Sequence, residues 1–414
     1  MPEYYDSLET RDPQERERAL MAALPKQLEH ARKNAPAFAK LLSGVDAREI
    51  TTRKALAQLP VTRKSELKDL QHKAPPFGGL AATAAGGLAR LFMSPGPIFD
   101  PEGRSADWWR MARPMFAAGI RAGDIVQNCY SYHFTPAASM MEGGALALGC
   151  AVIPAGTGQT EMQVQSMVEL RPKAYVGTPS FLKIILEKAA QTGADVSSVG
   201  TAVVGAEALP LSLRKWLHEH GVPRVQQIYA SADLGNIAYE SEALEGMIID
   251  EELIVEILRP GTGDPVADGE VGEVVVTPLN ADYPLVRFAT GDLSAVLPGA
   301  SPCGRTNMRI RGWMGRADQT TKVKGMFVHP FQVAEVVKRH KEILKARLVV
   351  DNPGGPDRMT LHCEAADAAP PAQLAQAIAE SLRDVTKLRG EVAFRKRGEL
   401  ANDGKVIEDA KKYD

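Results

Sequence analysis

The sequence predicts an α/β fold with a large, multi-subdomain core. This core combines a mostly parallel, helix-covered sheet with a β-rich subdomain and is followed by a small α+β C-terminal unit. The chain has 414 residues, which is too long for one ordinary hydrophobic core. Short apolar runs alternate with helical segments from about residue 107 to residue 290, as is typical of parallel sheets. After residue 250, Gly, Pro and Asp separate the apolar runs, which indicates the β-rich subdomain.

The composition is that of a globular protein. Hydrophobic residues make up 44%, charged residues 24%, and the formal net charge is −2, so no nucleic-acid partner and no attraction to membrane surfaces are expected. The four cysteines (Cys129, Cys150, Cys303 and Cys363) are far apart and lack CxxC spacing, which argues against a disulfide framework. The polar N-terminus and the lack of a long apolar run predict a cytoplasmic protein without a membrane span.

The elements of the core follow from the periodicity of apolar residues. Residues 14–45 are predicted to be helical, because Leu20, Leu24, Leu28 and Ala31 recur at helical spacing. Ligands bind at the carboxyl ends of parallel strands, so we expect the functional site there. The strands are predicted at 124–130, 150–155, 174–178, 201–206 and 225–230, with helices at 162–170 and 180–191.

The last third of the chain is predicted to contain two different structures. Strands at 252–257, 270–278 and 285–290 form the β-rich subdomain. Beyond a boundary near residue 316, helices are expected at 331–340 and 374–387 and strands at 346–351 and 359–365. We therefore expect a core of residues 1–316 and a C-terminal lid of residues 317–414.

Several short motifs occur along the chain in one order. They are GTGQTEMQ at 156–163, GTPSF at 177–181, GAE at 205–207, YASAD at 229–233, SPCGRT at 301–306 and RIRGWMGRADQTTKVKGMFVHP at 309–330. Together they resemble the phenylacetate–CoA ligase family of the adenylate-forming superfamily, in which the first five correspond to GGQT, TPSY, GAE, YGxTE and PCGRT. The resemblance covers nearly the whole chain.

The resemblance implies an AMP-forming ligase with the fold of adenylate-forming enzymes. Such an enzyme uses ATP and Mg²⁺ to activate a carboxylic acid as an acyl-adenylate, and then transfers the acyl group to CoA. It also implies a homodimer with a mobile lid. Two alternatives stay open: a nucleotide- and acyl-binding protein on the same fold that does not turn over ATP, and an adenylating enzyme with an acceptor other than CoA.

The resemblance assigns the adenosine site mainly to Tyr229 and Asp292. Tyr229 offers a flat face for adenine, and Asp292, in a predicted Gly-Asp turn, accepts hydrogen bonds from the ribose hydroxyls. Taken alone, these residues are equally well explained as a core tyrosine and a turn cap. The other residues that the resemblance places around the nucleotide are Ser94, Gly96, Gly205, Ala206, Glu207, Ala230, Ser231, Ile310 and Arg316.

The resemblance also assigns roles near the hinge and in the lid. Arg316 contacts ribose or phosphate, and Asp318 is the hinge about which the lid rotates. The Lys324-Gly325 turn resembles the lid loop that enters the site for the CoA step. Lys405 resembles the lid lysine that neutralises charge on the α-phosphate, the alternative being a lone surface lysine.

The segment in the place of the phosphate loop departs from the family pattern. The family loop is rich in Ser, Thr and Gly and carries a Lys, and its backbone N–H groups bind phosphate. In LFMSPGPIFDPEG, at 91–103, Ser94 and Gly96 remain, whereas Pro95 and Pro97 each remove an N–H donor. We therefore expect weaker binding of pyrophosphate but not of adenosine.

Further departures change the charge around the phosphates. Asp100 and Glu102 add negative charge. Asp233 replaces the family's Glu as the Mg²⁺ ligand, with a stem that is shorter by one methylene and that a bridging water can compensate. Ala232 lacks a hydroxyl that the family uses on the α-phosphate. The candidates for the missing cation are Arg90 and Arg104.

Some relatives hold a structural zinc, but this chain lacks the necessary ligands. Ser241 and Ile248 stand where Cys and His would be needed beside Cys303. A single cysteine cannot hold a tetrahedral zinc, so no zinc is expected.

The acid is expected beside Tyr132, His133 and Phe134, which form an aromatic wall suited to an aryl or arylalkyl acid. Ala206 and Ala230 are expected to line the same cavity. Packing of the three aromatic side chains in the core is the alternative.

Overall fold

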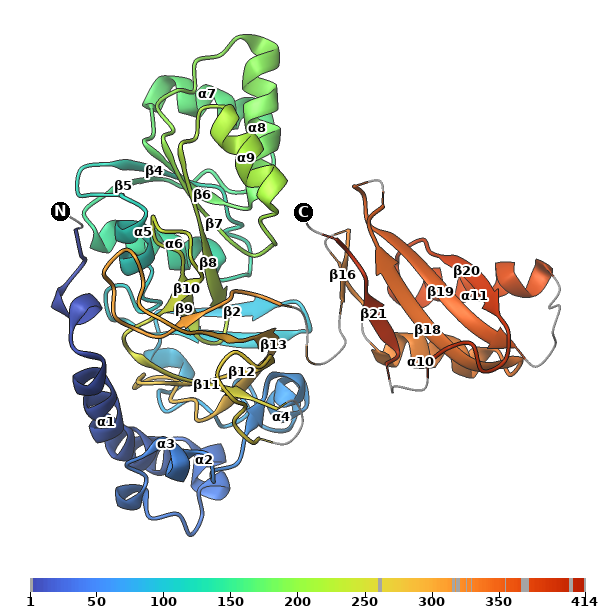
Figure 1. The fold of residues 1–414 in the computed structure, drawn as a ribbon, viewed down its shortest axis with the longest axis horizontal. Coiled ribbons are helices and arrows are strands. Elements are labelled where there is room, and N and C mark those ends of the chain that lie inside the picture. Colours follow the sequence, from blue (N-terminus) through green and yellow to red (C-terminus); the bar gives the residue numbers. More distant parts are fainter. Residues whose placement is uncertain are drawn as a thin grey trace. The chain divides into compact units, whose positions relative to one another are not determined.

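The computed structural model describes residues 3–259, 263–314, 317, 321–324, 326–328, 330–353, 355–365, 372–401 and 405–412. The chain divides into two compact units, Met1–Met314 and Gly315–Asp414 (Figure 1). Of the predicted site residues, Arg316, Asp318 and Gly325 lie outside the described residues. Among the helices that are described, none is both long and apolar enough to cross a membrane.

In the described part of the first unit, nine strands form the main sheet, in the order β14-β15-β10-β9-β8-β7-β6-β4-β5. The strands from β5 to β8 run parallel, which confirms the predicted parallel sheet for this half. The other half is antiparallel, because the short turn between β8 and β9 cannot make a parallel crossover. The bounds are β4 (Ile125–Asn128), β5 (Ala151–Ile153), β6 (Ala174–Gly177), β7 (Thr201–Val204), β8 (Arg224–Ser231), β9 (Gly235–Tyr239), β10 (Met247–Ile249), β14 (Val296–Leu297) and β15 (Arg309–Ile310).

Helices cover both faces of the parallel half (Figure 1). Val176 and Val203 pack in the same cluster as side chains of α5 and α6, whereas Tyr175 and Val204 pack with α7, α8 and α9. Successive residues of a strand face opposite sides, so burial on both sides explains the continuous apolar runs. These helices are α5 (Ala112–Ala117), α6 (Ala137–Ala147), α7 (Thr160–Leu170), α8 (Pro179–Thr192) and α9 (Leu211–Glu219).

A second sheet, in the order β1-β13-β12-β11, confirms the β-rich subdomain. The predicted turn at Gly291 and Asp292 is wrong, because both residues lie inside β13. The pairing of β12 with β13 shifts between Glu273 and Val275, so residues 290–292 form a bulge, and Gly291 adopts a φ of 77° there. The strands are β1 (Thr62–Arg63), β11 (Leu253–Leu258), β12 (Gly272–Pro278) and β13 (Phe288–Ser294).

The N-terminal part of the first unit is helical, as predicted for residues 14–45. The helix breaks at Ala35, whose backbone is extended, because the residue before a proline disfavours the helical conformation. Leu20, Leu24, Leu28 and Ala31 are all buried. The elements are η1 (Ser7–Thr10), α1 (Pro13–Asn34), α2 (Pro36–Leu41), η2 (Ala47–Glu49), α3 (Arg53–Leu56), η3 (Lys64–Glu66), α4 (Leu67–Lys73) and η4 (Ala85–Gly87), where η denotes a 3-10 helix.

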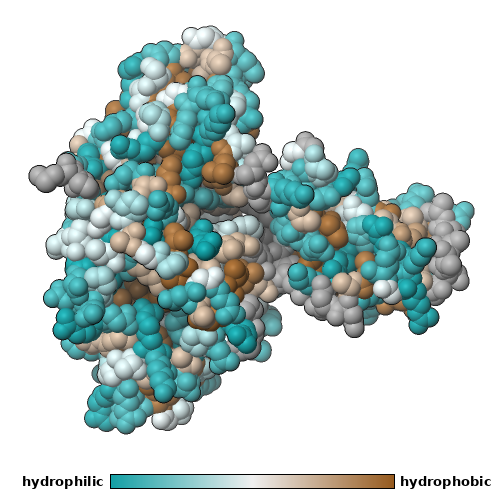
Figure 2. Space-filling model, viewed as in Figure 1, coloured by the Kyte–Doolittle hydropathy of each residue, from teal (hydrophilic) through white to brown (hydrophobic). Residues whose placement is uncertain are grey.

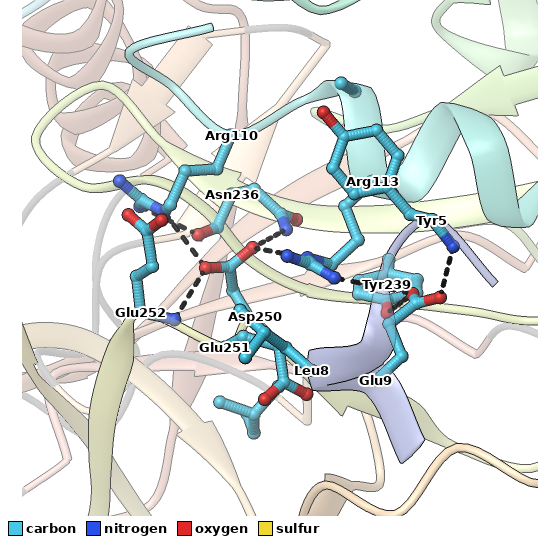
Figure 3. A network of polar contacts seen from close by, with 12 residues as sticks. Tyr5, Leu8, Glu9, Arg110, Arg113, Asn236, Tyr239, Asp250, Glu251 and Glu252 are labelled. Carbon is cyan, nitrogen blue, oxygen red and sulfur yellow. Dashed lines mark hydrogen bonds and ion pairs between the residues drawn. The ribbon is translucent and has the colours of Figure 1, made fainter. Parts of the chain in front are cut away.

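A buried polar network ties the first residues of the chain to the core (Figure 3). The Glu9 carboxylate accepts hydrogen bonds from the Tyr239 hydroxyl at 2.8 Å and from Arg305 Nε at 3.0 Å. Nearby, Asp250 Oδ1 lies 3.1 Å from Arg110 Nε. Buried charges need such partners. The arginine of the SPCGRT motif therefore has a structural contact in this chain.

The second unit is a small α+β structure, as predicted. Its sheet has the order β20-β19-β18-β21, beside a β16-β17 hairpin. Val336 of α10 and Ile378 of α11 pack with Leu348 and Leu361 of the sheet. The elements are β16 (Thr321–Val323), β17 (Met326–Val328), α10 (Pro330–Arg339), β18 (Ile343–Asp351), β19 (Arg358–Ala365), α11 (Ala372–Thr386), β20 (Glu391–Arg395) and β21 (Ile407–Asp409).

The visible surface is mixed in character. Figure 2 shows hydrophobic residues scattered among hydrophilic ones on the face in view. Single exposed apolar residues are normal for a folded protein. Three exposed apolar side chains are noteworthy because they lie next to the candidate site: Leu91, Phe99 and Phe134.

Candidate active site

The carboxyl ends of the parallel strands bring several of the predicted residues to one edge of the main sheet. Gly205 follows β7 directly, and Tyr229 and Ala230 lie near the end of β8. A Cβ on Gly205 would lie 2.9 Å from Ile228 Cγ1, so only glycine allows this close approach of the chain. This edge is where ligands bind in open α/β sheets.

Other residues assigned to the nucleotide have structural contacts. Glu207 accepts a hydrogen bond from the backbone N–H of Ser180 at 2.7 Å, in the first turn of α8. The Ser231 hydroxyl oxygen accepts one from the Leu234 N–H at 3.2 Å and shapes the turn after β8. Ala206 has a φ of 65° at the strand end. Ile310 is fully buried in β15, so its side chain belongs to the hydrophobic core.

Tyr229, Asp292 and Trp313 form a group that we name the tyrosine cluster. The Tyr229 hydroxyl donates to Asp292 Oδ2 at 3.0 Å, and the Trp313 indole N–H donates to Asp292 Oδ1 at 3.0 Å. These two contacts orient the carboxylate, and each of its oxygens can accept two hydrogen bonds. Trp313 was missed in the sequence analysis, although it lies only three residues before Arg316. Its ring is partly exposed.

Lys64 is a second residue that the sequence analysis missed. Its Nζ lies 2.5 Å from Asp233 Oδ2. The parallel pairing of β1 with β13 brings η3, which starts at Lys64, beside the bulge that carries Asp292. Burial works to lower the pKa of Lys64, but the charges of Asp233, Asp100 and Asp292 outweigh it and raise this pKa. The amine is therefore an ammonium at neutral pH.

Residues 91–103 form a β-hairpin rather than an open phosphate-binding loop. Its strands are β2 (Arg90–Ser94) and β3 (Ile98–Glu102), which pair Phe92 with Asp100. Gly96 lies in the short turn. The Ser94 hydroxyl donates a hydrogen bond to Asp100 Oδ2. The antiparallel pairing uses backbone N–H groups, and the side-chain bond uses the Ser94 hydroxyl. A phosphate loop would direct such donors towards its ligand.

Asp100 is fully buried. Burial, followed by the charge of Asp233, raises the pKa of Asp100 to about 7, against the opposing effects of Ser94 and Lys64. Burial and then the charges of Asp233 and Asp100 raise the pKa of Tyr283 well above its ordinary value. We name these five residues, Lys64, Ser94, Asp100, Asp233 and Tyr283, the lysine cluster.

The hairpin is fixed against the segment that carries Lys64. The Gln71 side chain of α4 accepts a hydrogen bond from the Phe99 N–H and donates one to the Phe99 carbonyl, both at 2.8 Å. Helix α4 follows η3 directly. These paired bonds therefore hold Asp100, the next residue of β3, near Lys64.

The two arginines predicted to replace the missing cation have other partners in the structure. Arg90 donates to Glu102 Oε1 at 2.8 Å, and Arg104 Nε donates to the Gly87 carbonyl at 2.9 Å. Both side chains are thus engaged elsewhere. The cation beside Asp233 is Lys64.

The predicted aromatic wall lies at the surface beside the hairpin. Tyr132, His133 and Phe134 are exposed, which excludes the alternative of core packing. The His133 and Phe134 rings meet edge to face at 4.5 Å. The Phe134 carbonyl accepts a hydrogen bond from the Met93 N–H at 2.9 Å, and the Tyr132 hydroxyl donates to Glu142 at 2.7 Å. The wall therefore borders β2.

The site has donors that suit a hard cation. Asp233 Oδ1 is buried without a hydrogen-bond partner among the residues that the structure describes, and carboxylate oxygen is the ligand that Mg²⁺ prefers. Within the same described residues, no group of three or more His, Cys, Asp or Glu side chains is placed to hold a metal ion. Cys303 Sγ lies 3.1 Å from Ser301 Oγ, and the expected lack of zinc stays a prediction.

Two predicted residues belong to the second unit. Lys324 connects β16 to β17 with a φ of 48°, and its N–H donates to Asp357 at 2.7 Å. Lys405 precedes β21 and is exposed. The roles assigned to both residues stay predictions.

Comparison with protein families and curated proteins gives consistent matches. The family model described as AMP-binding enzyme matches residues 105–278. The chain is 31% identical over 382 residues to a phenylacetate-coenzyme A ligase of Thermus thermophilus, covering 88% of this chain and 84% of that protein. It is 30% identical over 332 residues to one of Pseudomonas putida, covering 76% and 74%.

Solved structures with the same fold include two kinds of enzyme. A 2-hydroxyisobutyryl-CoA ligase in complex with 2-HIB-AMP and CoA superposes with a TM-score of 0.78 at 22% identity, covering 98% of this chain and 92% of that chain. An amide bond synthetase from Marinactinospora thermotolerans superposes with a TM-score of 0.53 at 16% identity, covering 93% and 92%. At these identities, the likeness establishes the fold.

Proposed function

The chain belongs to the phenylacetate–CoA ligase family, and on this premise we propose that it activates an aryl or arylalkyl carboxylic acid with ATP and transfers the acyl group to CoA. Family membership makes it an AMP-forming acid–CoA ligase. One observation carries the finer proposal: separate segments of the chain bring Tyr229, Asp292, Lys64 and Asp233 together at one edge of the core.

In the first half-reaction, the acid's carboxylate attacks the α-phosphate of ATP, and pyrophosphate leaves. The tyrosine cluster binds the nucleoside, with adenine on the Tyr229 ring and the ribose hydroxyls on Asp292. The Lys64 ammonium stabilises the negative charge that develops on the phosphates. Lys405 of the second unit serves the same purpose at the α-phosphate.

Asp233 is the residue that we assign to Mg²⁺. When bound, Mg²⁺ neutralises phosphate oxygens and orients the triphosphate. Asp233 also holds Lys64 by a direct ion pair. Asp233 would thus position two positive charges, Mg²⁺ and the Lys64 ammonium.

In the second half-reaction, the CoA thiol attacks the acyl carbonyl, and AMP leaves. We assign rotation of the lid to Asp318 and contact with ribose or phosphate to Arg316. The Lys324-Gly325 turn is assigned to the lid loop that enters the site for the CoA step. The acid lies along Tyr132, His133 and Phe134, with Ala206 and Ala230 on the same cavity. We expect the protein to be a homodimer in the cytoplasm.

Two other functions remain as candidates. The hairpin at 91–103, with the Ser94 hydroxyl bonded to Asp100, favours a nucleotide-binding protein that does not turn over ATP. Transfer of the acyl group to an acceptor other than CoA, such as an amine, is the second alternative.

The test is incubation of the purified protein with Mg·ATP, CoA and a panel of aryl and aliphatic acids, with pyrophosphate and thioester measured together. Release of both with an aryl acid is expected. Pyrophosphate without thioester would move the acceptor away from CoA. AMP binding with neither product would favour the binding-protein function.

A further inference from the structure

The Tyr132 side chain combines an exposed ring with a fixed hydroxyl. The residue is 42% exposed, and the loop that carries it lies between β4 and α6. Its hydroxyl oxygen accepts a hydrogen bond from Asn128 Nδ2 at 2.9 Å, and the hydroxyl donates one to Glu142 Oε2 at 2.7 Å. An exposed side chain normally changes rotamer freely. These two hydrogen bonds at the tip of the ring therefore hold it in one orientation.

Asn128 is the rigid one of the two partners. It is the last residue of β4 and is fully buried. Its side-chain amide also donates to the Ala138 carbonyl at 2.8 Å and accepts a hydrogen bond from the Tyr130 N–H at 3.2 Å. A carboxamide has two N–H donors, and both are engaged here. Asn128 therefore sets the place of the Tyr132 hydroxyl.

Glu142 supplies the second contact from α6. It lies one helical turn after Ala138, whose carbonyl Asn128 contacts, so Glu142 and Ala138 share one face of the helix. Burial, followed by the hydrogen bond and the charge of Glu142, raises the pKa of Tyr132. The phenol is therefore neutral at neutral pH and donates its proton to the carboxylate. Glu142 thus holds Tyr132 as a hydrogen-bond acceptor.

The backbone of the same loop is fixed as well. Phe134 has a φ of 63°, a conformation that residues other than glycine rarely adopt. Its carbonyl accepts a hydrogen bond from the Met93 N–H at 2.9 Å. The His133 N–H donates to Ser131 Oγ at 3.1 Å. Unfavourable backbone conformations persist where the surrounding structure holds them, and they are concentrated at ligand sites. The aromatic wall is therefore a preorganised surface.

We propose that Glu142 is a positioning residue for the acid: by holding the Tyr132 hydroxyl, it fixes the ring against which an aryl or arylalkyl acid packs, so that the site prefers such acids to aliphatic ones of similar size. Two aromatic rings attract each other at defined angles and distances, whereas a flexible alkyl chain adapts to a moving surface. A side chain that is fixed before binding also loses less conformational entropy when the ligand arrives. The inference rests on the proposed function, in which Tyr132 borders the acid, and it adds to that function a role for Glu142.

The test is equilibrium binding of phenylacetate and of octanoate to the full-length protein without ATP, measured by ligand-observed NMR. The wild type should bind phenylacetate more tightly than octanoate. Glu142→Ala should raise the Kd of phenylacetate about three- to tenfold, the equivalent of ordering one side chain, and leave the Kd of octanoate unchanged. Glu142→Gln keeps an oxygen acceptor and should bind both acids like the wild type. Glu169→Ala, on an exposed position of α7, is the matched control and should do the same.

Tyr132→Phe tests whether Glu142 acts through the Tyr132 hydroxyl. This variant keeps the ring but removes both hydrogen bonds, so it should lose at least as much phenylacetate affinity as Glu142→Ala. Adding Glu142→Ala to it should cause no further loss, because contacts that act as a unit are not additive. Additive losses, equal losses for the two acids, a wild-type Kd in Glu142→Ala, or the same loss in Glu142→Gln as in Glu142→Ala would each overturn the inference. A wild type that binds phenylacetate no better than octanoate would do so as well.

The binding assay separates this inference from the proposed function. A selective loss of phenylacetate binding in Glu142→Ala, in a protein that forms neither pyrophosphate nor thioester, would support the role of Glu142 and overturn the proposed activity. Thioester formation from phenylacetate with the same KM in the wild type and in Glu142→Ala would do the reverse.

Discussion

The tyrosine cluster and the lysine cluster lie at the same edge of the core, but they are built differently. In the tyrosine cluster, both oxygens of Asp292 accept hydrogen bonds from neutral donors, those of Tyr229 and Trp313. In the lysine cluster, the Lys64 ammonium pairs with Asp233, Asp100 accepts a hydrogen bond from the Ser94 hydroxyl, and three polar atoms lack partners among the described residues. Both carboxylate oxygens of Asp292 therefore have a partner, whereas Asp100 and Asp233 each have one oxygen without a partner among the described residues.

The two clusters suit different parts of a nucleotide. A nucleoside is neutral, and a preorganised set of rings and hydrogen-bond acceptors suffices to bind it. A triphosphate brings several negative charges and its own cation. In the lysine cluster, Asp233 is the residue that we assign to that cation, so we expect the cluster to bind Mg·ATP and not free ATP. We expect substitutions in the two clusters to have separable effects.

The largest effect is expected from Lys405→Ala. If the second unit supplies the charge that stabilises the α-phosphate, acyl-adenylate formation should fall by about 10²- to 10³-fold, the usual loss when one stabilising group is removed. AMP affinity should change little. Single-turnover formation of acyl-adenylate measures this effect, with Lys396→Ala, an exposed lysine of the same unit, as control. An unchanged rate would show that the assignment of Lys405 is wrong.

Lys64→Met should have the next largest effect. It tests most directly whether the two clusters act on different parts of the nucleotide. Loss of the ammonium next to Asp233 should lower kcat/KM for Mg·ATP by about 10²-fold, with AMP binding nearly unchanged. Lys68→Met, on an exposed position of α4, is the matched control. If AMP affinity fell as much as kcat/KM, the two clusters would not act separately, because Lys64 would then act on the nucleoside as well.

Much of the fold was predictable from sequence, whereas only part of the site was. The strands from β4 to β8 and the helices α7 and α8 agree with the predictions, because their apolar periodicity is strong and local. Asp233 and Tyr229 could be assigned because they lie in motifs.

Lys64 and Trp313 could not be found in this way, because their contacts are with residues far away in sequence. The pairing of β1 with β13 brings Lys64 beside the bulge of Asp292, and its ammonium contacts Asp233 from there. The hairpin at 91–103 was missed for a different reason. The Pro-Gly-Pro turn resembles a broken loop, and only the cross-strand pairing of Phe92 with Asp100 shows that it closes a ladder.

Asp292→Asn tests the tyrosine cluster. An amide keeps the shape of the side chain but loses its charge and one acceptor, so hydrogen bonds from ribose weaken. AMP affinity should fall about tenfold, the equivalent of one charge-assisted hydrogen bond. Isothermal titration calorimetry with AMP, without metal, measures this change, and Asp268→Asn in an exposed loop is the control. Unchanged AMP affinity would remove Asp292 from the nucleoside site.

The smallest effect is expected at Asp107, which belongs to neither cluster. Burial shifts the pKa of its carboxyl. Burial raises the pKa of Asp107 to about 6 from an ordinary value of 3.8, although the Ala112 and Met111 N–H groups oppose this shift. The folded state therefore holds this proton more tightly than the unfolded state does. Its contribution to stability is complete below about pH 4 and is lost as the pH rises through about 6.

The wild type should accordingly lose about 2 to 3 kcal/mol relative to Asp107→Asn between pH 4 and pH 6.5. Melting temperatures of the two proteins across this range measure the difference, and kcat/KM for Mg·ATP should be equal in both at pH 7. A raised pKa alone would then change stability without changing catalysis. A large loss of activity in Asp107→Asn would instead mean that a carboxyl outside both clusters influences the site.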